Sequence, residues 1–90
     1  MIRKHVYVSG KVQGVYFRVF TEKAARKYGV KGWVRNMSDG RVEAVVEGEK
    51  DSVGKMLQWF WSGSPYSKVD GVEEQDVEHT GEFKTFSIRY

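Results

Sequence analysis

The order of strand-like and helical stretches restricts this chain to few architectures. Residues 3–9 alternate apolar and polar side chains, which predicts a strand. Apolar side chains at helical spacing then predict a helix over residues 17–28, with Gly29 as its stop. A second helix is predicted over residues 50–61, with a buried stripe made of Val53, Met56, Leu57 and Phe60.

A hairpin is predicted between the two helices. Residues 31–37 and 41–48 are strand-like and flank Asp39-Gly40, a dipeptide typical of tight hairpin turns. The second of these strands alternates apolar with charged side chains, namely Val42, Ala44 and Val46 against Arg41, Glu43 and Glu47. Such alternation predicts a sheet that is covered on one side only.

Two further stretches complete the predicted fold. Residues 69–78 are weakly strand-like, and residues 83–90 alternate around Phe86 and Ile88 as a final strand. The resulting order is that of two split βαβ units. We therefore predict the α+β class, a ferredoxin-like βαββαβ sandwich with a mainly antiparallel sheet and two helices on one face. Ninety residues suffice for one such domain, to which we assign residues 1–90.

The connection before the first helix lacks a capping residue. Residues 10–18 are Gly-Lys-Val-Gln-Gly-Val-Tyr-Phe-Arg, and the first carboxylate of the chain is Glu22. Arg18 instead places a cation where the helix dipole disfavours one. Free N–H groups, glycines that permit positive φ, and a guanidinium together form an anion site. We infer that a phosphate-like ligand supplies the missing cap; the alternative is a tight turn through Gly10 and Gly14 beside a solvated arginine.

The composition excludes several kinds of catalytic site. The chain has no cysteine, so disulfides and thiol chemistry are unavailable. His5 and His79 are its only histidines, and for both we favour a structural or surface role over catalysis. A site made of amides and an arginine suits a leaving group that departs without a proton. An acyl phosphate meets this condition, because its leaving group is a carboxylate, and an alkyl phosphate ester does not.

Two motifs resemble the signatures of the acylphosphatase family. One is residues 10–18, and the other is Gly32-Trp-Val-Arg-Asn36 followed by Asp39-Gly40-Arg-Val-Glu43. The resemblance covers nearly the whole chain and implies hydrolysis of acyl phosphates by an oriented water, without a metal or other cofactor. It implies that Arg18 binds the phosphate and that Asn36 holds the attacking water. The implied phosphate-binding loop comprises Val12, Gln13, Gly14, Val15, Tyr16, Phe17 and Arg18.

Three residues refine this interpretation. Tyr16 and Ser64 are small departures from the family pattern, and neither is expected to touch a proposed catalytic group. Asn36 is a poor strand former inside a strand-like run, which is unusual unless its side chain has a role. An amide can donate to a phosphate oxygen and accept from a water. The alternative for Asn36 is an early start of the turn.

The expected partners are small molecules. The net charge of +3 suits an anionic substrate, and the resemblance implies an acyl phosphate, with inorganic phosphate as product and inhibitor. RNA-recognition domains share the ferredoxin-like topology, but Glu43 and Glu47 on the outward side of the sheet would repel phosphates, so we expect no nucleic-acid binding. A domain that relays an acyl or carbamoyl phosphate within a larger assembly is the second alternative.

The sequence also predicts location and oligomeric state. No apolar run is long enough for a membrane span, and the first residues lack a signal-peptide pattern, so we expect a cytoplasmic protein that does not bind membranes. We expect a monomer. Trp59 and Trp61 fall partly off the buried stripe of the second helix, which leaves a dimer open.

Overall fold

Five strands and two helices make up the computed structural model, which describes residues 1–90. Their order is β1, α1, β2, β3, α2, β4, β5. They span β1 Ile2–Lys11, α1 Phe17–Tyr28, β2 Lys31–Asn36, β3 Val42–Gly48, α2 Lys50–Ser62, β4 Lys68–Val77 and β5 Phe86–Ile88. The predicted ferredoxin-like order is confirmed, and the final strand is shorter than predicted.

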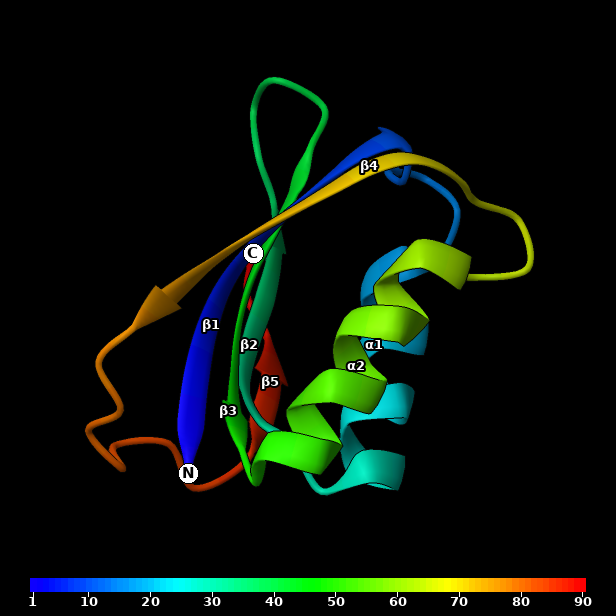
Figure 1. The fold of residues 1–90 in the computed structure, drawn as a ribbon. Helices are drawn as coiled ribbons and strands as arrows, with labels where there is room; N and C mark the ends of the chain where they lie inside the picture. The colour runs from blue at the N-terminus through cyan, green and yellow to red at the C-terminus, as the bar shows by residue number, and fades with distance from the viewer.

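The strands form one sheet in the order β4-β1-β3-β2-β5. All neighbours are antiparallel except β2 and β5, which are parallel. Both helices lie on the same side of this sheet, as Figure 1 shows. The core fills the space between, because the registers align Val6, Ala44 and Val34 across three adjacent strands.

The two helices bury the faces that their spacing predicts. Helix α1 buries Phe17, Thr21, Ala24 and Ala25. Helix α2 buries Val53, Met56 and Phe60, whereas Leu57 of the predicted stripe is only partly buried. Trp59 packs against Phe17, with ring centroids 5.5 Å apart, whereas Trp61 is 56% exposed. Neither helix combines the length and the apolar character that crossing a membrane requires.

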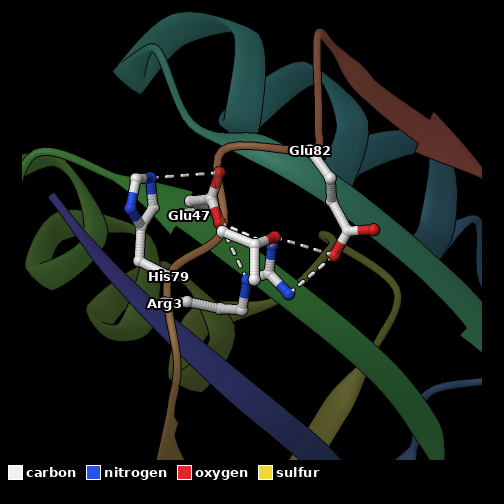
Figure 2. Close-up of polar contacts among 5 residues, drawn as sticks. Arg3, Glu47, His79 and Glu82 are labelled. Atoms are coloured by element: carbon white, nitrogen blue, oxygen red, sulfur yellow. Dashed lines mark hydrogen bonds and ion pairs between the residues drawn. The ribbon is translucent and has the colours of Figure 1, made fainter.

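The sheet face opposite the helices is not open, contrary to the prediction. Glu43 and Glu47 of β3 are only 7% and 2% exposed. The physical reason is that β3 is central, so long side chains from β1, from β2 and from residues 78–85 fold over its carboxylates. Figure 2 shows one such group: Arg3 lies between Glu47 and Glu82, and His79 approaches Glu47.

This second face is held together by paired charges. The Arg3 guanidinium donates to Glu47 Oε1 at 2.8 Å, to Glu82 Oε1 at 2.9 Å and to Thr80 Oγ1 at 2.8 Å. The bond from Arg3, assisted by the Thr80 hydroxyl, holds the pKa of Glu82 below its usual value. Residues 78–85 are thereby fastened across the sheet on their way from β4 to β5.

A second cluster on the same face surrounds Glu43. His5 Nε2 lies 2.6 Å from Glu43 Oε2, and Arg35 Nε donates to Glu43 Oε1 at 2.5 Å. Burial opposes the charged carboxylate, but the hydrogen bonds from His5 and Arg35 outweigh it and keep the pKa of Glu43 below its usual value. Because Glu43 and Glu47 are buried and paired, they offer little exposed negative charge on this face, and the expectation of no nucleic-acid binding stays a prediction.

Candidate active site

The candidate site begins with the loop of residues 12–16, between β1 and α1. The N-cap position of α1 is Tyr16, whose side chain makes no capping hydrogen bond, and the first turn carries no acidic residue. No main-chain N–H from Val12 to Tyr16 donates to another backbone group. Gly14 and Tyr16 have φ angles of 73° and 61°, which bend the loop in the manner of anion-binding backbone nests. The predicted uncapped helix start is confirmed.

The loop is anchored through its side chains and one carbonyl, and its amides remain free. Gln13 Nε2 donates to the carbonyls of Met37 and Arg41, at 2.7 and 2.9 Å, and so ties the loop to the β2–β3 turn. The buried hydroxyl of Ser64 donates to the Val15 carbonyl at 2.7 Å. As expected, Ser64 contacts neither Arg18 nor Asn36 through this bond, but it helps to hold the shape of the loop.

Gly10 has a different role from Gly14. It lies within β1, with φ 118°, where the pairing of β1 with β4 shifts register. A Cβ at this position would lie 2.3 Å from the Lys68 carbonyl oxygen. Gly10 is thus required for close approach of β4, whereas Gly14 shapes the loop itself.

A cavity of about 290 Å³ opens beside the loop. It is lined by Val12, Gly14, Tyr16, Phe17, Arg18, Val19, Asn36, Ile88 and Tyr90. The structure thus brings Arg18 and Asn36 to the same cavity as most of the predicted loop. Gln13 and Val15 do not line it, because the first bonds to the β2–β3 turn and the second is buried in the core.

Three lining residues were not predicted from the sequence. Val19 follows Arg18 in the first turn of α1, Ile88 is the last residue of β5, and Tyr90 lies just after that strand. The parallel pairing of β5 with β2 sets Ile88 beside Val34 and so brings the end of the chain next to Asn36. The sequence predicts a final strand but not its neighbour in the sheet.

Asn36 is the last residue of β2, in register with Val42 of β3. The alternative in which the turn starts at Asn36 is therefore wrong. Its Oδ1 is buried and has no hydrogen-bond partner. A buried acceptor without a partner destabilises a folded chain by about 1–3 kcal/mol, so Asn36 Oδ1 is a candidate to accept a hydrogen bond from a bound water or ligand.

Arg18 provides the positive charge of the cavity. It is half-buried in the first turn of α1, and its guanidinium carbon lies 4.8 Å from the centre of the Tyr90 ring. The cavity lining contains no Asp, Glu or His side chain. The two histidines lie on the other face of the sheet, beside Glu43 and Glu47. The chain holds no group of three side chains suited to a metal ion.

Comparison with known proteins agrees with this geometry. A model of the acylphosphatase family matches residues 4–88. An acylphosphatase of Syntrophobacter fumaroxidans is 50% identical over 98% of this chain and 91% of its own length. One of Pyrobaculum calidifontis is 53% identical over 98% of this chain and 81% of its own length.

A solved structure agrees as well. The crystal structure of acylphosphatase from Bacillus subtilis superposes with a TM-score of 0.96 at 37% identity, over the whole of both chains. The family match, the sequence identities and the shared fold cover the same residues. The chain therefore belongs to the acylphosphatase family of hydrolases.

Proposed function

We propose that this protein hydrolyses acyl phosphates by attack of a water that Asn36 orients, with no metal ion. The observation that carries the proposal is the unpartnered Asn36 Oδ1, buried in the same cavity as Arg18 and the free amides of the loop. Loop amides and a guanidinium suit a phosphoryl group, and a buried acceptor beside them suits a water. Together they place a nucleophile next to an electrophile.

The proposed reaction takes place in one step. The amides of residues 12–18 and the Arg18 guanidinium bind the phosphoryl oxygens and stabilise their charge. Asn36 Oδ1 accepts a hydrogen bond from the water and points its oxygen at phosphorus. A new P–O bond forms while the bond between phosphorus and the acyl oxygen breaks, and the carboxylate leaves with the electron pair. The water's proton passes to a phosphate oxygen.

This scheme requires no side chain that titrates near neutral pH. The carboxylate leaving group is stable without protonation, and the cavity lining offers no His, Asp or Glu side chain. We therefore expect a broad pH profile around neutrality. A narrow bell-shaped profile that disappears on mutation of His5 or His79 would contradict the scheme.

The direct test is hydrolysis of benzoyl phosphate in ¹⁸O-labelled water, with excess EDTA present. The proposal predicts turnover that EDTA leaves unchanged and label found in inorganic phosphate. Label in benzoate would show attack at the carbonyl carbon and would contradict the role of the loop. Loss of turnover in EDTA, restored by a divalent ion, would contradict the metal-free step.

Several sequence-based expectations stay predictions. These are one domain over residues 1–90, a monomer in the cytoplasm, inhibition by inorganic phosphate, and no binding to nucleic acids or membranes. Exposed Trp61 keeps a dimer as the alternative, which sedimentation would reveal. Binding of a single-stranded RNA at about 0.15 M salt would contradict the nucleic-acid expectation.

A further inference from the structure

Tyr16 adopts a backbone conformation that suits glycine better. It is the only non-glycine residue with positive φ, at φ 61° and ψ 22°. A side chain in this left-handed region destabilises the fold, and such strain concentrates at functional sites. The Tyr16 side chain does not offset this destabilisation by capping α1, because it makes no capping hydrogen bond. Its presence calls for an explanation other than backbone geometry.

Tyr16 is one of the residues that line the cavity. It is 67% exposed, and its ring meets that of Tyr66 edge to face, with centroids 6.1 Å apart. Val19, Ile88 and Tyr90 line the same cavity. Arg18 has the only charged side chain in the lining, so the part of a substrate beyond its phosphate meets mainly apolar and aromatic side chains.

Resting on the proposed function, we infer that Tyr16 is a specificity-determining residue and selects acyl phosphates whose acyl group is aromatic and uncharged. The phosphoryl group occupies the loop amides and Arg18, and the aromatic acyl group contacts the Tyr16 ring. Aromatic contacts of this kind favour an aromatic group over a methyl group. A second anionic group on the acyl chain finds no second cation in the lining.

The test compares kcat/KM for benzoyl phosphate with kcat/KM for acetyl phosphate. The inference predicts that the wild-type protein prefers benzoyl phosphate, and that Tyr16→Gly lowers this preference about fivefold, mainly through KM for benzoyl phosphate. Tyr16→Phe keeps the ring and is expected to keep the preference. Trp61→Ala removes an exposed aromatic side chain outside the cavity and serves as the matched control.

The outcomes separate this inference from the proposed function. Thermal unfolding of Tyr16→Gly should not occur at a lower temperature, because glycine relieves the positive φ. Equal kcat/KM for the two substrates in the wild-type protein would overturn the inference and leave hydrolysis intact. A Tyr16→Gly variant that loses both activities in the same proportion would also overturn it. Failure to hydrolyse either substrate would overturn the proposed function itself.

Discussion

Buried polar groups have partners on the outer face of the sheet but lack them at the loop end of the molecule. On the face away from the helices, Glu47 is 2% exposed and paired with Arg3, and Glu43 is paired with His5 and Arg35. At the loop end of the molecule, Asn36 Oδ1 is buried without a partner, and the amides of residues 12–16 donate to no backbone group. Polar groups satisfied within the protein stabilise the fold, and we propose that those left unsatisfied at the loop end bind a ligand.

The largest effect is expected at the ligand end, from Arg18→Ala. Loss of one preorganised donor to a developing charge lowers turnover by about 10²–10³-fold, and Arg18 also binds the substrate, so we expect kcat/KM for benzoyl phosphate to fall by about 10³-fold. Inhibition by inorganic phosphate should be lost as well. Arg26→Ala is the matched control, because Arg26 is exposed on the same helix and pairs only with Glu22.

The corresponding change on the paired face is Arg3→Met. It leaves Glu47 buried with only His79 nearby, and removing one partner of a buried ion pair costs about 3 kcal/mol. Urea denaturation should show this loss, with kcat on benzoyl phosphate unchanged at a temperature where the variant is folded. Lys4→Met is the control: Lys4 pairs with Glu74 and the largely exposed Asp76, and its loss should cost less than about 1 kcal/mol. If both variants lost the same free energy of unfolding, the buried pair would stabilise the fold no more than the exposed one, which would contradict the account.

The third change, Asn36→Ala, separates the roles of the site residues. We expect kcat to fall by about 10²-fold while inorganic phosphate still inhibits, because the loop and Arg18 remain. The free energy of unfolding should not decrease, since the variant removes a buried oxygen that has no partner. Ser38→Ala, in the exposed turn next to β2, is the control. Normal turnover with lost phosphate inhibition would reverse the assigned roles.

The smallest effect concerns acid stability. The pKa of Glu43 is lowered in the folded protein, so the unfolded chain binds the proton more readily. The stabilisation is therefore complete above the ordinary glutamate pKa of about 4.3 and disappears as pH falls through the lower folded value. Glu43→Gln should lose less stability than the wild-type protein between about pH 5 and pH 3 in urea titrations. An identical slope would mean that His5 and Arg35 do not stabilise the charged form.

Much of the fold follows from local patterns. Helix α1 has the predicted bounds, because its apolar spacing and Gly29 define both ends, and Gly29 adopts the left-handed conformation of a helix stop. The uncapped start of α1 was also predictable, because it depends only on residue types near Arg18. Asn36 could be singled out because an amide is uncommon within a strand.

The remainder depends on long-range pairing that local patterns do not encode. The neighbours of β5 bring Ile88 and Tyr90 to the cavity, and only the assembled sheet determines them. The burial of Glu43 and Glu47 was missed for the same reason, since most of their partners, namely Arg3, His5 and His79, lie far from them along the chain. The hydrogen bond from Ser64 to the loop could not be predicted either, because it depends on how the segment after α2 packs against the loop.

Titration of the ¹⁵N-labelled protein with inorganic phosphate, followed by amide chemical shifts, tests the central claim most directly. We predict saturable shifts at the amides of residues 12–18 and at the Asn36 side chain. The amides around Arg3, Glu43 and Glu47 should stay unchanged, because their charges are already paired. Shifts confined to that paired face, or no saturable shift in the loop, would contradict the account.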